Sequence, residues 1–319
     1  MGENGQVDVG HPAIEHLAIV VVYYLKDDDD LPFLQIHLDR VARHTHVPST
    51  LYAVANRVTP AARALIEAQP DVVLLDLPET ELRGSREHAH YLDALVGSAL
   101  ADGASHVCTL DVDSFPVHDD WAARVWAVAP ASSGLAGVLR LENGDVALPH
   151  PSCVFAARAF FERYRPSFSP DSDGSAEFRG FLRSTGQSAD TGIRLGCILW
   201  SQHLAWGHLL RSNAVDPDGL MAGIYADAIF HMGGIGRGKL FRRDVEGSMV
   251  HRLTAPLERV PVRSERAVRV QRAALRRLRG STEARLAARN RETYALLRGW
   301  LFSDPDGFIA FLRGGAPAS

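Results

Sequence analysis

The feature that most constrains the fold is a series of short apolar runs, rich in β-branched and aromatic residues, that alternate with segments of helical spacing. The apolar runs lie at 17–24, 50–55, 71–76 and 106–110, and the helical segments between them at 34–43, 60–69 and 85–101. Continuous apolar runs are typical of strands buried on both faces of a parallel sheet. Helices between such strands form right-handed βαβ units. The sequence therefore predicts an α/β fold with a mostly parallel sheet flanked by helices.

The fourth apolar run is followed at once by two aspartates, Asp111 and Asp113, and soon afterwards by Pro116. Side chains alternate faces in an extended chain, so both carboxylates are predicted to project the same way. Proline cannot donate to a sheet ladder, so the strand should end close to this pair. Two neighbouring carboxylates favour a divalent cation between them, Mg²⁺ or Mn²⁺, with diphosphate oxygens as further ligands. A solvated strand end is the simpler alternative.

Charge divides the chain. From Arg252 to the C-terminus there are fourteen arginines, no lysine and six acidic residues, so this part carries +8 and residues 1–251 carry −12. We expect a boundary near 252, because such asymmetry is typical of separate regions. An acidic main domain also argues against nucleic acid as a partner. The expected regions are a disordered lead at 1–15, a main domain at 16–251 with halves at about 16–120 and 121–251, and an Arg-rich helical region at 252–319.

The C-terminal region has a helical spacing of apolar residues between Val260 and Arg298, with Gly280-Ser281 as a break. We predict two or three amphipathic helices here. They could pack on the acidic domain, form a homodimer contact, or lie against an anionic membrane surface.

Several classes of protein are disfavoured. No run of 18 apolar residues exists, so no membrane span is expected. The N-terminus lacks the basic and apolar segments of a secretory signal, and three dispersed cysteines are expected to be reduced, which favours a cytoplasmic location. No glycine-rich dinucleotide fingerprint follows the first strand and no P-loop motif is present. A dinucleotide oxidoreductase or a P-loop enzyme is therefore not expected.

Three further stretches could carry chemistry. Asp190 precedes the apolar run 193–206, which fits a helix, and it is either a plain helix cap or a general base for an acceptor hydroxyl. His231 enters a glycine-rich segment and is either structural or a further metal ligand. Arg237 and Lys239, shortly after it, could offset phosphate charge.

The start of the helical segment 85–101 is less specific. Ser85 and His88 could face a nucleotide near the two aspartates, or they could belong to an exposed helix face. The polar stretch 166–177 is predicted to be a mobile surface loop, which is either a plain solvated loop or a lid over the substrate.

Taken together, these residues resemble the GT-A nucleotide-sugar glycosyltransferases, in particular family-2-like enzymes. The resemblance covers about residues 17–240 and rests on the segment 110–116, the helix entry at 84–93, the segment 190–192 and His231. It implies a GT-A fold, and it implies that the first half of the main domain binds the nucleotide and the second half the acceptor. The family's acidic pair at the base position is here Ala189-Asp190, with a single carboxylate.

The resemblance also implies roles for individual residues. Asp111 and Asp113 would bind the metal and the diphosphate of a UDP-, GDP- or dTDP-sugar, and His231 would complete the metal site. Asp190 would be the base of an inverting transfer. The loops after the first two strands would hold the nucleoside, through Tyr24 and Asn56-Arg57.

Two alternative functions are kept. A nucleotidyltransferase acting on sugar phosphates also uses paired aspartates at a sheet edge, but the segment 24–30 is acidic where that class usually carries a glycine-rich and basic loop. A nucleotide-sugar-binding protein without catalytic turnover is the other alternative. Transfer assays separate both from the glycosyltransferase.

Overall fold

The computed structural model describes residues 13–233, 240–258, 260 and 264–315. By their internal contacts these residues form two compact units. The first unit comprises the described residues of Met1–Arg140 with Asp145–Ala214 and Gly223–His231, and the second comprises Leu141–Gly144, Val215–Ala222 and the described residues of Met232–Ser319. Each unit is considered by itself below.

Within the described residues, the first unit contains a seven-stranded sheet. Its strands, in spatial order, are β3 (Val72–Leu74), β2 (Ser49–Ala55), β1 (Leu17–Tyr23), β4 (His106–Leu110), β7 (His150–Ala157), β6 (Leu135–Val138) and β8 (Gly207–Leu209). Strands β3, β2, β1 and β4 are parallel, β7 is antiparallel to both of its neighbours, and β8 is parallel to β6. The predicted α/β class with a mostly parallel sheet is confirmed. The reversal at β7 places the N-terminal end of this strand beside the carboxyl end of β4.

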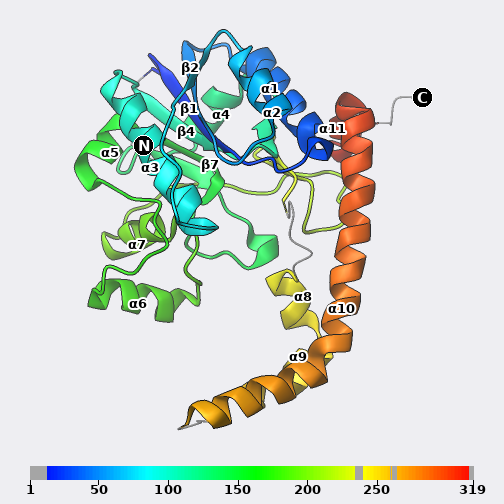
Figure 1. The fold of residues 1–319 in the computed structure, drawn as a ribbon. Helices are drawn as coiled ribbons and strands as arrows, with labels where there is room; N and C mark the ends of the chain where they lie inside the picture. Colours follow the sequence, from blue (N-terminus) through cyan, green and yellow to red (C-terminus); the bar gives the residue numbers. More distant parts are fainter. Residues whose placement is uncertain (1–12, 234–239, 259, 261–263, 316–319) are drawn as a thin grey trace, which may run out of the picture. The chain divides into compact units, whose positions relative to one another are not determined.

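One face of this sheet is covered by α3 (Ser85–Ala101), which lies across the strands in Figure 1. Tyr91, Leu92 and Leu95 of this helix are buried in one apolar cluster with Val20 of β1 and Val54 of β2. Short helices α5 (Arg158–Tyr164), α6 (Ala176–Thr185) and α7 (Ile193–Ser201) follow later in the chain. The helix predicted at 85–101 is confirmed at both ends.

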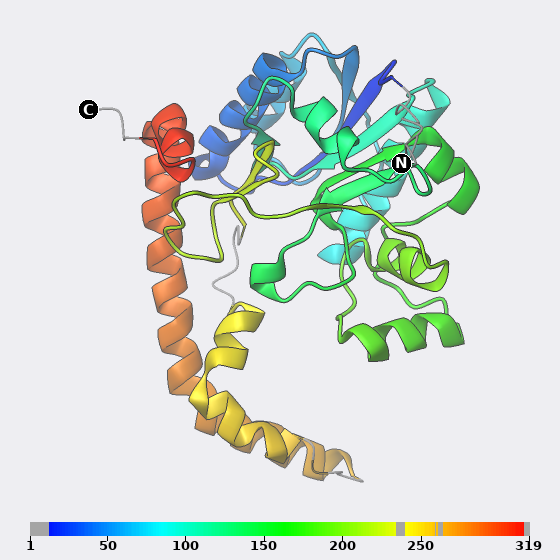
Figure 2. The same cartoon turned by 180° about the vertical axis from the view of Figure 1, so that it is seen from behind.

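The opposite face is covered by α1 (Leu31–His44), α2 (Pro60–Glu67) and α4 (Trp121–Ala127), and Figure 2 shows the sheet from behind. The ring of Tyr23, at the end of β1, packs edge-on against His37 of α1, with 5.5 Å between ring centroids. Trp121 and Trp126 of α4 pack against Phe155 of β7. Alternation along each strand supplies both faces with apolar side chains.

A second, antiparallel sheet in the same unit has the order β5 (Ser114–Pro116), β10 (Ile229–His231) and β9 (Gly223–Tyr225). Phe115 and Phe230 stack across β5 and β10 with 4.8 Å between ring centroids. Only residues 111–113 separate β4 from β5, and β5 pairs with β10. The small sheet therefore brings the end of β10 to the carboxyl edge of the main sheet.

The stretch 166–177 is anchored to α3. The carboxylate of Asp93 accepts a 2.6 Å hydrogen bond from the Ser167 hydroxyl and a 2.8 Å bond from the backbone N–H of Phe168, whose ring is buried. Ser175 then caps α6 by accepting from the N–H of Phe178. The stretch is thus tied to the core at Phe168, and its predicted role as a lid stays a prediction.

One helix is shorter than predicted. The apolar run 193–206 was expected to be helical throughout, but α7 ends at Ser201. His203 has a φ of 51°, in the left-handed region, which stops a right-handed helix. The remaining apolar residues of the run form the connection that leads into β8.

The second unit is mainly helical. It contains α8 (Arg242–Gly247), α9 (Met249–Glu258), α10 (Glu265–Ser303) and α11 (Pro305–Leu312), besides the short 3-10 turn η2 (Leu141–Asn143); a similar turn, η1 (Asp28–Asp30), precedes α1 in the first unit. The predicted break at Gly280-Ser281 is wrong, because α10 runs through it. A glycine inside a helix costs only about 1 kcal/mol, which α10 tolerates. No helix among the described residues is long and apolar enough to span a bilayer.

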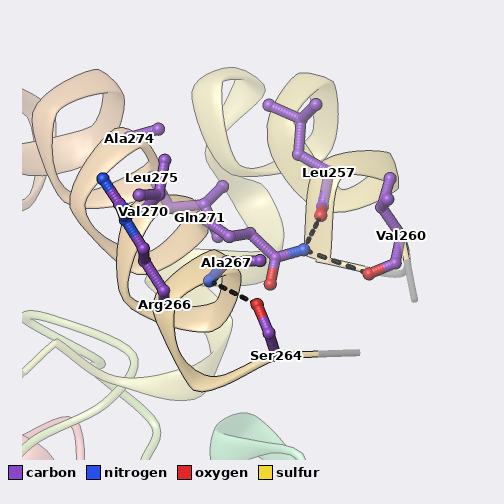
Figure 3. A pocket seen from close by; sticks show the side chains of 9 residues that line it. All are labelled: Leu257, Val260, Ser264, Arg266, Ala267, Val270, Gln271, Ala274 and Leu275. Carbon is purple, nitrogen blue, oxygen red and sulfur yellow. Dashed lines mark hydrogen bonds between the residues drawn. The ribbon is translucent and has the colours of Figure 1, made fainter. Parts of the chain in front are cut away.

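An apolar groove of about 530 Å³ lies between α9 and the first turns of α10 (Figure 3). At its end the Gln271 amide donates to the carbonyl oxygens of Leu257 and Val260, and Ser264 caps α10 by accepting from the N–H of Ala267. The homodimer contact and the membrane contact, which are alternatives to packing on the acidic domain, stay predictions.

Candidate functional site

The two aspartates lie in a turn rather than in an extended strand. Strand β4 ends at Leu110, and the N–H of Ser114 then donates a 2.9 Å hydrogen bond to the carbonyl oxygen of Asp111. The predicted strand alternation across the pair is therefore wrong, but both carboxylates approach the ring of His231. The side chain of Asp111 is 24% exposed and that of Asp113 is 7% exposed. The strand does stop beside the pair, but the turn ends it, and Pro116 closes the next strand.

His37 supports this turn from the α1 side. Its Nδ1 lies 2.9 Å from the carbonyl oxygen of Ser114 and also faces the backbone of Asp111. A carbonyl can only accept, so Nδ1 carries the proton. Burial lowers the pKa of His37 to about 4, so the ring stays neutral near pH 7. The turn is thus held by a buried, uncharged donor.

Carboxylates and imidazoles converge at the turn. A carboxylate oxygen of Asp111 and one ring nitrogen each from His150 and His231 all lie within 4.8 Å of one another. Oδ2 of Asp113 is 3.8 Å from Nε2 of His231, and Oδ1 of Asp111 is 3.6 Å from Nε2 of His88. These side chains come from the turn, from α3, from the start of β7 and from the end of β10.

The electrostatics of His231 suit a metal ligand. Burial first, and then the positive charges of Arg140 and Arg211, lower its pKa to about 3. The imidazole is therefore neutral and keeps a lone pair for a cation. Oxygen donors with an imidazole nitrogen form a set that suits Mn²⁺, and carboxylates alone suit Mg²⁺. The residues present thus fit the divalent cation that the sequence predicts.

Asp190 is directed at α3. Its Oδ1 accepts from the hydroxyl of Ser85 and, at 2.9 Å, from the N–H of Thr191. The Thr191 hydroxyl in turn donates to the carbonyl oxygen of Ser85, at 3.2 Å. Gly192 is the residue before α7, and no side chain caps that helix. The plain helix-cap interpretation of Asp190 is therefore wrong, and the carboxylate is exposed.

The first turn of α3 contacts both Asp190 and the group of side chains around Asp111. Ser85 and His88 are three residues apart, so they lie on one face of the helix. Ser85 contacts Asp190, and His88 contacts Asp111. Ser85 and His88 therefore lie between the predicted base, Asp190, and the predicted metal ligand Asp111. The sequence allows either a nucleotide-facing or an exposed position for them.

The predicted nucleoside residues follow β1 and β2. The N–H of Asn56 donates to the carbonyl of Tyr23, and the Asn56 side chain is buried. Nε of Arg57 donates a 3.0 Å hydrogen bond to the buried carboxylate of Glu87 on α3. Tyr24 is 42% exposed. Arg57 is thus held against α3, and the Lys26 ammonium lies 5.2 Å from the centroid of the partly exposed Tyr24 ring.

Arg237 and Lys239 lie outside the described residues. His150 was missed, because nothing in the sequence shows that β7 runs against β4. The register pairs Leu110 with Cys153, so the N-terminal end of β7 lies at the carboxyl end of β4. The His-Pro-Ser that opens the apolar run of β7 is the only local signal that could have found it.

No protein-family model matches the sequence, and no curated protein matches it. Among solved structures, the galactosyltransferase LgtC in complex with donor and acceptor sugar analogs is 12% identical, covering 78% of this chain and 98% of that one with a TM-score of 0.38. The catalytic domain of Drosophila beta1,4galactosyltransferase 7 in complex with xylobiose is 13% identical, covering 69% and 72%, with a TM-score of 0.37. The S. aureus protein TarS with UDP-GlcNAc is 9% identical, covering 63% and 60%, with a TM-score of 0.38. Because these scores are low, the functional argument rests on the side chains described above.

Proposed function

We propose that this chain is a divalent-metal-dependent glycosyltransferase that moves a sugar from a nucleoside diphosphate sugar to an acceptor hydroxyl. The observation that carries the proposal is the convergence of Asp111, Asp113 and His231 beside the first turn of α3, whose Ser85 contacts Asp190. One face of one helix thereby lies between the candidate cation ligands and an exposed carboxylate, and the sequence resemblance implies a metal site and a base carboxylate at these residues.

Asp111, Asp113 and His231 would hold Mn²⁺ or Mg²⁺. When bound, the cation supplies Lewis-acid stabilisation of the negative charge on the departing nucleoside diphosphate. The chain contributes a neutral His231 and a preorganised turn, so no large rearrangement is needed as charge develops. The N-terminal N–H groups of the 17-residue helix α3 add a partial positive charge beside His88.

Asp190 takes the proton of the acceptor hydroxyl as the oxygen attacks the anomeric carbon. The Ser85 hydroxyl and the Thr191 N–H orient its carboxylate without adding a charge. A base on the attacking side needs no second acid if the leaving group departs as a metal-stabilised diphosphate. The proposal is therefore an inverting transfer, in contrast to glycoside hydrolysis with its two carboxyl groups.

The experiment is thermal unfolding with UDP, GDP and dTDP, each with and without Mn²⁺. One diphosphate is expected to raise the unfolding temperature only in the presence of the metal, because ligand binding to the folded state stabilises it. Asp113→Asn should remove this increase. The matched control is Asp39→Asn, an exposed carboxylate of α1 that pairs with Arg43.

Product analysis with the corresponding sugar nucleotides separates the alternatives. Transfer or slow hydrolysis of the sugar supports the glycosyltransferase. Formation of a nucleotide-sugar from a sugar phosphate identifies a nucleotidyltransferase, and binding without any turnover identifies a non-catalytic binding protein. Either of these two results overturns the proposal, as does unchanged stabilisation in Asp113→Asn.

A further inference from the structure

His150 lies within the cluster of possible metal ligands, yet its hydrogen bonds point to a different role. The backbone N–H of Ser152 lies 3.2 Å from Nδ1 of His150, and the Ser152 hydroxyl lies 2.8 Å from the same nitrogen. A backbone N–H can only donate, so Nδ1 is the acceptor and carries no proton. The proton of the neutral ring is therefore on Nε2.

This pattern is the reverse of that found for a metal-binding histidine. A ligating imidazole offers its unprotonated nitrogen to the metal and donates its other N–H to a carbonyl or carboxylate. In His150 the unprotonated nitrogen is already occupied by two donors from Ser152. The other nitrogen, Nε2, carries the proton, so it is able to donate a hydrogen bond and has no lone pair for a cation.

The surroundings of His150 call for a donor. Its ring lies against that of His231, with 5.2 Å between centroids and 33° between planes, and one of its two ring nitrogens is within 4.8 Å of an Asp111 oxygen. A diphosphate bound to a cation at Asp111, Asp113 and His231 would bring further anionic oxygens to this place. A neutral N–H is suited to these oxygens, because it binds an anion without competing for the metal.

We propose that His150 is a hydrogen-bond donor to the diphosphate of the sugar nucleotide, through Nε2–H, and that it is not a metal ligand. The proposal rests on the proposed function, since it assigns a diphosphate to the same site. It divides the roles of two neighbouring histidines: His231 binds the cation, and His150 binds the anion that the cation carries. The backbone N–H of Ser152 produces this difference, because it occupies Nδ1 of His150 and leaves the ring proton on Nε2.

The test uses the intact chain with Mn²⁺ alone and then with inorganic pyrophosphate in saturating Mn²⁺, both followed by calorimetry. His150→Ala should leave the Mn²⁺ dissociation constant within about threefold of the wild type. It should weaken pyrophosphate binding about tenfold, because a hydrogen bond to a charged group contributes about that factor. His150→Gln, which keeps an N–H donor, should restore most of the loss, and His231→Ala should weaken Mn²⁺ binding itself at least tenfold.

Other outcomes overturn the inference. If His150→Ala weakens Mn²⁺ binding as much as His231→Ala does, His150 is a ligand. If His150→Ala binds pyrophosphate as tightly as the wild type does, His150 does not donate a hydrogen bond to the diphosphate. A wild-type chain that binds Mn²⁺ but no pyrophosphate contradicts this inference, and one that binds neither Mn²⁺ nor any nucleotide contradicts the proposed function as well.

A second measurement does not depend on how the variants fold. Nitrogen-15 NMR of the histidine rings in the metal-free protein distinguishes the two tautomers, and the His150 signal is assigned by its loss in His150→Gln. We expect the proton on Nε2. A proton on Nδ1 would contradict the hydrogen bond from Ser152 and with it the donor role.

Discussion

Oδ2 of Asp113 lies 3.8 Å from Nε2 of His231, although Asp113 belongs to the turn after β4 and His231 ends β10. The small sheet explains this approach, since His231 pairs in register with Ser114, the residue after Asp113. Both side chains are nearly buried, and a carboxylate oxygen and an imidazole nitrogen are both groups that a divalent cation such as Mn²⁺ can bind.

The first prediction concerns the base. Asp190→Asn should lower the transfer rate by a factor of about 10²–10⁴, because an amide cannot accept the acceptor proton. Binding of the nucleoside diphosphate with Mn²⁺ should be unchanged, which calorimetry can check. Ser85→Ala is the graded control, with a smaller loss expected because the carboxylate keeps its bond from Thr191. A variant Asp190→Asn that retains full activity contradicts the assignment.

The second prediction concerns Arg57 and Glu87. The Glu87 side chain is only 5% exposed and accepts from Nε of Arg57, so Arg57→Met leaves a buried carboxylate without that partner. We expect the free energy of unfolding to fall by about 2 kcal/mol or more. Arg63→Met breaks the exposed pair with Glu67 and should cost about 0.5 kcal/mol. Urea denaturation measures both, and equal losses would show that Glu87 needs no charged partner.

The third prediction concerns acid stability. Burial lowers the pKa of His106 to about 4, whereas an unfolded histidine titrates near about 6.5. The unfolded chain therefore binds the proton first, and the stabilisation present above about pH 6.5 is lost as the pH falls towards 4. His106 alone should remove about 2 kcal/mol between pH 7 and pH 5. His106→Phe should flatten this dependence in urea denaturation; an unchanged slope would mean that the folded chain takes up this proton as readily as the unfolded chain does.

The fourth prediction concerns two glycines of the second unit. A Cβ at Gly280, inside α10, meets no atom within 4 Å, so Gly280→Ala should raise stability by about 0.5–1 kcal/mol. A Cβ at Gly307 would overlap the Asp304 carboxylate, which caps α11 by accepting from the Gly307 N–H. Gly307→Ala should therefore destabilise the chain. A loss of stability in Gly280→Ala would indicate that α10 is interrupted there after all.

Much of the first unit could be predicted because its signals are local. The apolar runs of β1, β2 and β4 and the spacing in α3 each specify an element without reference to the rest of the chain. The sequence also indicates three candidate site residues, because a carboxylate beside an apolar run lies at the end of a buried element. These are Asp111, Asp113 and Asp190. The pairing of β5 with β10 is not predictable from local signals, since it joins segments that lie far apart in the sequence.

The sequence by itself determined the α/β order of elements and the acids that bear on function, because helical and strand periodicities and strand ends are properties of neighbouring residues. Only the tertiary structure decided that β7 runs against β4, that His150 thereby reaches Asp111, and that Ser152 occupies its Nδ1. The physical reason is that strand direction and side-chain contacts depend on pairings between distant segments. No local pattern encodes those pairings, and the packed core selects them.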